Sequence, residues 1–218
     1  MNLWISALDL LFPPRCPFCR RVLEDPRAPL CPACQPNLPW LGEKASFRKV
    51  EFAEGCWSPL EYRDGVRECI HRYKFTPTPA YGEPLGKLMA QCVQDHPEIQ
   101  PDLVTWAPLS RKRLRQRGFD QAEGLAKTVG RELGLPVLRT LNKTRHTPRQ
   151  SDLEEKAARR ANALGAYSLY PEAAVQGKWI LLVDDVITSG STLEECASIL
   201  REHGAAKVWC LTLAQAGK

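Results

Sequence analysis

The chain has 218 residues, of which 44% are hydrophobic and 25% charged, and its formal net charge is +5. This composition is that of an ordinary globular protein and argues against wholesale disorder. No apolar run reaches the length of a membrane span, and the mild basic excess suits phosphate-bearing ligands or nucleic acid without requiring either.

The first segment is apolar. Residues 1–12 contain Asp9 and no basic residue, so they lack the positive start of a secretory signal. They are also too short to span a bilayer. We expect a short helix here that packs on the body of the protein.

Four of the nine cysteines form two Cys-x-x-Cys pairs. Cys16 and Cys19 are separated by eleven residues from Cys31 and Cys34. Zinc prefers four tetrahedral ligands, and two thiolate pairs supply them. A redox pair or a disulfide is the alternative, but two pairs together favour structural zinc. Because four thiolates leave no open position, this zinc would stabilise a small segment rather than catalyse.

The remaining five cysteines are scattered at apolar positions, which is unlike a secreted disulfide scaffold. Their distribution indicates a reducing, cytoplasmic location. Zinc ribbons contact nucleic acid or protein, and the sequence leaves both open.

From Cys56 onward the pattern alternates between helices and strands. Apolar periodicity predicts helices at 65–75, 84–93, 119–133 and 193–203, and strands at 103–107, from 137, at 179–183 and at 208–213. Gly134 would end the third helix. Such alternation predicts a parallel α/β sheet.

The strongest functional signal is the segment 180–192, Ile-Leu-Leu-Val-Asp-Asp-Val-Ile-Thr-Ser-Gly-Ser-Thr. Its apolar strand is expected to end at Asp184 and Asp185, and ligands of open α/β sheets bind beyond the carboxyl ends of strands. A hydroxyl-rich loop with Gly190 then opens a helix, whose N-terminus favours an anion. The two carboxylates can accept hydrogen bonds from vicinal ribose hydroxyls.

Three other interpretations fit this segment less well. A Walker B strand needs a Gly-x-x-x-x-Gly-Lys-Ser/Thr loop elsewhere, which the sequence does not supply. A response-regulator receiver needs more chain than the 33 residues that follow Asp185. A buried strand before a capped helix explains the apolar run, but it does not explain two adjacent aspartates before Thr-Ser-Gly-Ser-Thr.

The segment resembles the motif with which type I phosphoribosyltransferases bind 5-phosphoribosyl pyrophosphate (PRPP). In that family the paired acidic residues hold the ribose hydroxyls and the following loop holds the 5-phosphate. The resemblance implies PRPP as the ligand, with Mg²⁺. It assigns the catalytic and ribose-binding roles to Asp184 and Asp185, and the phosphate-binding role to Thr188, Ser189, Gly190, Ser191 and Thr192.

The whole chain resembles a narrower group, the ComF family, whose members join an N-terminal zinc-binding segment to a phosphoribosyltransferase domain. Further stretches carry this resemblance: Tyr73-Lys74-Phe75, Pro108-Leu109, Arg117-Gly118-Phe119-Asp120-Gln121, Arg145-x-Thr147-Pro148-x-Gln150-Ser151, Arg159-x-x-Asn162 and Gly165-Ala166-Tyr167. The family usually has Asn at the position of Asp120, which leaves a direct ligand contact through residue 120 open.

The resemblance implies an α/β fold, namely a type I phosphoribosyltransferase-like parallel sheet with helices on both faces, preceded by a small zinc-binding segment. We divide the chain accordingly into residues 1–55, an N-terminal helix with a four-cysteine zinc-ribbon-like segment, and residues 56–218, the phosphoribosyltransferase-like domain. The resemblance also implies a role in DNA uptake, natural transformation or the use of external DNA.

Residues 110–118 include five cations. A solvated charged turn or a DNA contact would explain them. A pyrophosphate leaving group also needs several positive charges nearby. We therefore assign the pyrophosphate side to Lys74, Arg111, Lys112, Arg113 and Arg117. Phosphoribosyltransferases cover the site with a mobile loop, and residues 144–160 are the candidate for it, with Arg145, Gln150 and Arg159.

Three hypotheses remain. An enzyme would displace pyrophosphate at the anomeric carbon, helped mainly by positioning and charge stabilisation. No residue stands out as a general base, so the acceptor is open. A non-catalytic PRPP or nucleotide sensor, or a single-stranded DNA-binding module of the competence machinery, is the alternative. A scaffold with an inactive site is the least informative reading, and the intact segment 184–192 argues against it.

Overall fold

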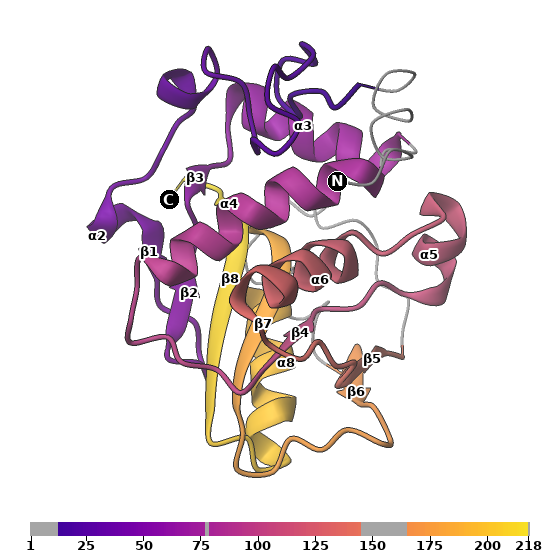
Figure 1. Ribbon diagram of the computed structural model, residues 1–218. Helices are drawn as coiled ribbons and strands as arrows, with labels where there is room; N and C mark the ends of the chain where they lie inside the picture. The colour runs from indigo at the N-terminus through magenta and orange to yellow at the C-terminus, as the bar shows by residue number, and fades with distance from the viewer. Residues whose placement is uncertain (1–12, 77–78, 145–164, 218) are drawn as a thin grey trace.

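The computed structural model describes residues 13–76, 79–144 and 165–217 (Figure 1). The expected N-terminal helix at 1–12 lies outside these residues. In chain order the elements are η1 (Gln35–Asn37), α2 (Glu43–Ser46), β1 (Phe47–Arg48), β2 (Gly55–Trp57), β3 (Leu60–Glu61), α3 (Asp64–Phe75), η2 (Pro79–Tyr81), α4 (Gly82–Gln94), β4 (Leu103–Trp106), α5 (Arg111–Arg117), α6 (Gln121–Leu133), β5 (Leu141–Lys143), β6 (Tyr167–Leu169), β7 (Trp179–Ile187), α8 (Ser191–Glu202) and β8 (Lys207–Gln215).

A six-stranded sheet forms the centre of the described chain, in the order β1-β2-β8-β7-β4, with β3 also pairing with β8. All its pairings are parallel except that of β1 with β2 at the edge. The expected parallel α/β sheet is therefore confirmed. The strand expected from Val137 forms only a single parallel bridge with Val104. Thr140 then returns to β4 through a 2.7 Å hydrogen bond between its hydroxyl and that of Thr105.

Helices cover both faces of the sheet (Figure 1). Alternate residues of a strand point to opposite faces, and β7 follows this rule. Leu181 and Val183 pack with α3, α4 and α6, whereas Ile180 and Leu182 pack with α8. All four are fully buried. Each such side chain stabilises the fold by roughly 1.5–3 kcal/mol, which explains the apolar run.

Helices α4 and α6 approach closely through small residues. A Cβ added at Gly86 would lie 2.5 Å from the Cβ of Thr128. One turn away at the same interface, the Tyr73 hydroxyl of α3 lies against Gly82 and Gly124 and donates to the carbonyl of Gln121, 3.0 Å away. Three helices are thus fixed around the beginning of α6, close to the carboxyl ends of β4 and β7.

Two elements differ from the sequence expectation. Strand β7 does not end at the aspartates but continues to Ile187, because β8 runs equally far and pairs with it up to Gln215. The basic run after Ser110 is not a loop but the helix α5. The Ser110 hydroxyl accepts from the N–H of Arg113, and Gly118 ends the helix in the left-handed region at φ 79°.

Within the described residues, no helix has both the length and the apolar character needed to cross a bilayer.

Candidate phosphoribosyl site and metal centre

The cysteines of the two pairs come together at one point. The Sγ atoms of Cys16, Cys19, Cys31 and Cys34 all lie within 4.8 Å of one another, and those of Cys19 and Cys31 are 3.5 Å apart. Thiolates bound to zinc at about 2.3 Å in a tetrahedron stand roughly 3.8 Å apart. The cluster therefore fits a structural zinc ion with four thiolate ligands.

This cysteine segment is docked on two helices. Nη2 of Arg72 in α3 donates to the carbonyls of Pro17 and Phe18, each 2.8 Å away. Nζ of Lys87 in α4 donates to the carbonyl of Arg27 at 3.3 Å. Three apolar residues of the segment share a core with α3 and α4: Phe18, Leu23 and Leu30.

The paired carboxylates lie in the last part of β7, and they point to opposite faces of the sheet. Asp185 faces α3, where Nζ of Lys74 lies 2.8 Å from each of its carboxylate oxygens. Asp184 faces the α8 side and accepts a 2.8 Å hydrogen bond from the N–H of Asp185. Burial, and after it the negative charge of Asp185, raises the pKa of Asp184 above its usual value.

The hydroxyl loop follows directly. Gly190 has φ 93° and is the N-cap of α8. A glycine cap places no side chain over the first turn. Ser189 and Ser191 share a 2.7 Å hydroxyl–hydroxyl hydrogen bond. A small cavity is lined by Asp184 and by four residues of the loop: Thr188, Gly190, Ser191 and Thr192.

The antiparallel strands β5 and β6 bring two further groups close enough to Asp184 for its charge to influence their pKa values. Nζ of Lys143 donates to the Tyr167 hydroxyl at 2.9 Å. Burial, and after it the charge of Arg113, lowers the pKa of Lys143, and the charge of Asp184 opposes this shift. The sequence alone does not single out Lys143 from the other basic residues. Nothing in its local pattern shows that the pairing of β5 with β6 brings it close to β7.

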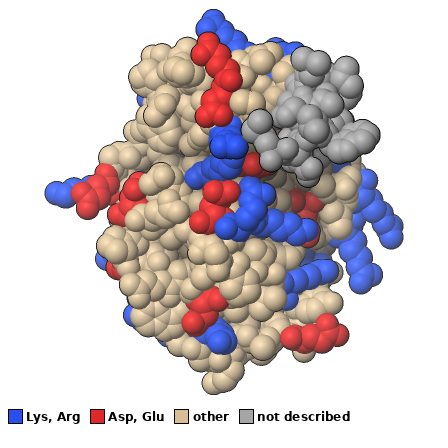
Figure 2. All heavy atoms as spheres, viewed as in Figure 1, with Lys and Arg blue, Asp and Glu red and all other residues tan. Residues whose placement is uncertain are grey.

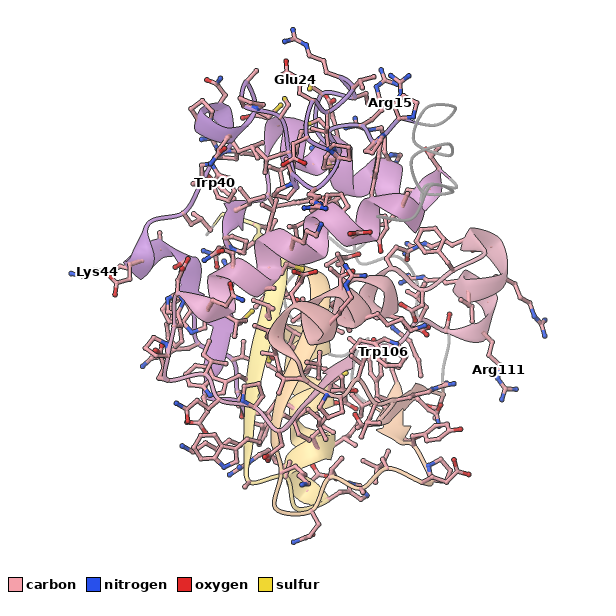
Figure 3. All side chains as sticks on the ribbon, viewed as in Figure 1. Arg15, Glu24, Trp40, Lys44, Trp106 and Arg111 are labelled. Carbon is pink, nitrogen blue, oxygen red and sulfur yellow. The ribbon has the colours of Figure 1, made fainter. Side chains whose placement is uncertain are left out.

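The cations assigned to the pyrophosphate side separate in space. Lys74 contacts Asp185, and Arg113 lies close enough to Lys143 to influence its pKa. Arg117 stacks on the Phe75 ring, with its Cζ 4.9 Å from the ring centroid. Figure 2 shows Lys and Arg side chains projecting from the side of the molecule on which α5 lies, and in Figure 3 Arg111 points away from the body. Lys112 is also exposed.

Asp120 has a backbone role. One carboxylate oxygen accepts from the N–H groups of Ala122 and Glu123 at the start of α6, at 3.1 and 3.4 Å. The other accepts from the N–H of Leu109 at 2.8 Å. Burial raises the pKa of Asp120 to about 6. Residue 120 therefore ties the beginning of the basic segment to α6. Arg145, Gln150 and Arg159, named for the covering loop, lie outside the described residues.

Comparisons with known proteins identify two domains along the chain. The double zinc ribbon domain matches residues 7–46, and the phosphoribosyl transferase domain matches residues 118–218. The DNA utilization protein YhgH of Salmonella typhimurium is 32% identical over 208 residues, which are 90% of this chain and 88% of that protein. Competence protein F of Haemophilus influenzae is 30% identical over 224 residues, 93% of this chain and 97% of that protein. The chain belongs to the ComF family.

A more distant ComF relative, competence protein ComFC of Bacillus subtilis, is 28% identical over 227 residues, 95% of this chain and 87% of that protein. The expected combination of a zinc ribbon with a phosphoribosyltransferase domain is confirmed for this ComF protein. The domain boundary at residue 55 and the individual site roles stay predictions.

The zinc centre can be tested by replacing one ligand. We expect the Cys31→Ser variant to lose most of the roughly one zinc ion per chain and to melt at a lower temperature, because three thiolates hold zinc less tightly. Elemental analysis and thermal unfolding measure both. Cys92→Ala, a buried cysteine outside the cluster, is the control and should keep its zinc. Full zinc occupancy in Cys31→Ser would contradict a four-thiolate centre.

The charged carboxylate of Asp184 should lower the free energy of unfolding of the protein at neutral pH, because burial raises its pKa. The unfolded carboxyl loses its proton near pH 4, at a pKa of about 3.9, whereas the folded one keeps it to higher pH. Stability therefore falls as the pH rises between the two pKa values, and the full cost is present above the folded one. We expect Asp184→Asn, which stays neutral, to raise the free energy of unfolding at pH 8 by about 1–3 kcal/mol.

The gain should shrink toward zero as the pH falls to about 4, which urea unfolding at several pH values measures. Asp25→Asn, at an exposed carboxylate, is the control and should change stability by less than about 0.5 kcal/mol. A stability difference between Asp184→Asn and the wild type that is no more favourable at pH 8 than at pH 4 would contradict the raised pKa of Asp184.

Proposed function

We propose that this protein binds PRPP with Mg²⁺ at the carboxyl end of β7 and serves DNA uptake or the use of external DNA as a phosphoribosyltransferase-type protein. The observation that carries the proposal is the order of three features along one short stretch of the chain. Two carboxylates in β7 are followed by a hydroxyl loop, and a glycine N-cap then opens α8. Ribose hydroxyls and a 5-phosphate need acceptors and an anion site at such adjacent positions.

The ribose and the phosphate would divide between these groups. The Asp184 and Asp185 carboxylates accept from the ribose hydroxyls, and the loop from Thr188 to Thr192 surrounds the 5-phosphate. The left-handed Gly190 supports this role because the absence of a side chain lets the backbone approach the anion. Mg²⁺ bound with PRPP would neutralise charge on the pyrophosphate and takes oxygen ligands.

Three cations from separate elements support a pyrophosphate side. Lys74 comes from α3, Arg113 from α5 and Lys143 from β5. Without ligand, Lys74 holds both oxygens of Asp185, so binding must share or release its ammonium group. A released Lys74 would then stand next to the leaving group. Cations fixed where charge develops stabilise a departing anion.

A catalytic step would be a displacement at the anomeric carbon of the ribose. The bond from this carbon to the pyrophosphate oxygen breaks, that oxygen keeps the electron pair, and an acceptor atom forms the new bond. The acceptor is left open. The printed names of the relatives, a DNA utilization protein and two competence proteins, support the DNA context.

PRPP binding can be tested by titration calorimetry of the zinc-loaded protein in the presence of Mg²⁺. We expect saturable binding that falls by at least about 100-fold in the Asp184→Ala, Asp185→Ala double variant, because several charge-assisted hydrogen bonds are lost. Asp25→Asn, an exposed carboxylate far along the chain, should bind as the wild type does. A folded wild type without affinity for PRPP would refute the proposal.

A second function, binding of single-stranded DNA, is favoured by the outward side of α5. Arg111, Lys112 and Arg115 are exposed on this helix, and Arg111 points away from the body of the molecule in Figure 3. A positive surface that follows a phosphate backbone is the usual basis of such binding. With an intact ligand site, this would make the protein a PRPP-sensing DNA-binding module without catalysis.

The DNA hypothesis predicts a salt effect. We expect the Arg111→Ala, Lys112→Ala, Arg115→Ala variant to bind a fluorescent oligo-dT more weakly than the wild type. The steepness of the plot of log affinity against log salt should fall by about 2, because three fewer phosphate contacts release fewer counterions on binding. Lys44→Ala, Lys49→Ala, Lys178→Ala removes three exposed charges elsewhere and should change little. Equal slopes for the two variants would argue against α5 as a DNA contact.

A further inference from the structure

Arg48 links residues 43–48, the connection that follows the cysteine segment in the chain, to the loop of the candidate site. It lies in β1 and is partly buried. Its Nη1 donates to the carbonyl of Thr188 at 2.6 Å, and its Nη2 donates to the carbonyl of Ala216 at 2.8 Å. These acceptors are 140 and 168 residues away along the chain. No local pattern in the sequence singles out this arginine.

The two carbonyls belong to segments that already touch. The N–H of Ala216 donates to the carbonyl of Ile187 at 2.9 Å, directly before the loop. The planar fork of Arg48 therefore bridges the start of the loop and the end of β8 on the side of β1. A guanidinium presents its N–H donors in a fixed geometry, so it can hold two acceptors at a set separation.

The position of Arg48 is fixed from the N-terminal part of the chain. The side chain of Gln215 donates to the carbonyl of Ala45 in α2. The N–H of Ser58 donates to the carbonyl of Ser46 at 2.9 Å. The connection 43–48, which follows the cysteine segment, is thereby held against β2 and the end of β8.

Holding the Thr188 carbonyl also directs the loop. In a trans peptide unit the C=O and the next N–H point in opposite directions. With the Thr188 carbonyl turned toward Arg48, the N–H of Ser189 is turned away from it, on the side where the loop can meet an anion. The Arg48 charge behind the loop adds favourable electrostatics for a phosphate.

We propose that Arg48 is a positioning residue that keeps the loop 188–192 in its anion-binding shape and makes this shape depend on the docked connection 43–48. The identity of the anion rests on the proposed function. The effect on the loop itself does not, and it can be measured without any ligand.

The first experiment measures affinity. Zinc-loaded full-length protein and its Arg48→Ala, Arg48→Lys and Lys44→Ala variants are titrated with ribose 5-phosphate and with PRPP plus Mg²⁺. We expect Arg48→Ala to weaken both ligands by about tenfold or more, which is the usual effect of losing hydrogen bonds to a charged group. Arg48→Lys should be intermediate, because an ammonium keeps the charge but lacks the fork. Lys44, exposed in the same connection and pointing outward in Figure 3, is the matched control, and its variant should stay within about twofold of the wild type.

Chemical rescue distinguishes the positioning role of Arg48 from a general effect on folding. Millimolar methylguanidinium should restore much of the affinity of Arg48→Ala and leave Lys44→Ala unchanged, because the added group can occupy the space between the two carbonyls. A general loss of folding would not be repaired in this way.

The second experiment is amide hydrogen exchange of residues 187–193 without ligand. We expect exchange to be about tenfold faster in Arg48→Ala and unchanged in Lys44→Ala, since the loop loses its anchor. If the wild type binds neither ligand, the proposed function fails and exchange alone decides the role of Arg48. Wild-type affinity together with wild-type exchange in Arg48→Ala would overturn the proposal. If that variant does not fold, the same two results in Arg48→Lys would overturn it.

Discussion

The site depends on the pairing of β7 with β8 beyond the apolar core. The two strands stay in register up to Ile187 and Gln215, so both aspartates are inside the sheet rather than after it. Strand alternation then forces Asp184 to one face and Asp185 to the other. A carboxylate in this place is partly stripped of water, which raises the pKa of Asp184, while Lys74 compensates Asp185. The same pairing sets where the loop begins.

Charge of the opposite sign reaches this strand end from elements that are far apart in sequence. Lys74 approaches from α3 on one face, and Lys143 approaches from the β5–β6 hairpin on the other. Arg48 contacts the loop from β1. A binding site often keeps charges that a stability optimum would remove. Under the proposed function, a ligand that carries hydroxyls and phosphates would compensate the charges at this strand end.

The sequence predicted whatever is encoded locally. The buried strand, the loop with Gly190 and the four cysteines each occupy a short continuous segment. Their patterns can therefore be recognised in the sequence without knowledge of the fold. Helix α5 was missed because it buries no side chain in the described structure and so shows no apolar periodicity. Arg48 and Lys143 were not assigned because their roles come from contacts across the sheet, which no spacing records. For Asp120 the family pattern leaves a ligand contact open, and the structure adds three backbone N–H groups that donate to its carboxylate.

Helix α3 connects the two modules physically. Arg72 and Lys74 are two positions apart, which places them about 200° apart around the helix. One side chain therefore holds the carbonyls of Pro17 and Phe18 beside the cysteine cluster, while the other holds Asp185 in the sheet. The helix therefore lies between the cysteine cluster and Asp185. Arg48, in the segment that follows the cysteines, makes a separate contact with the loop of the candidate site.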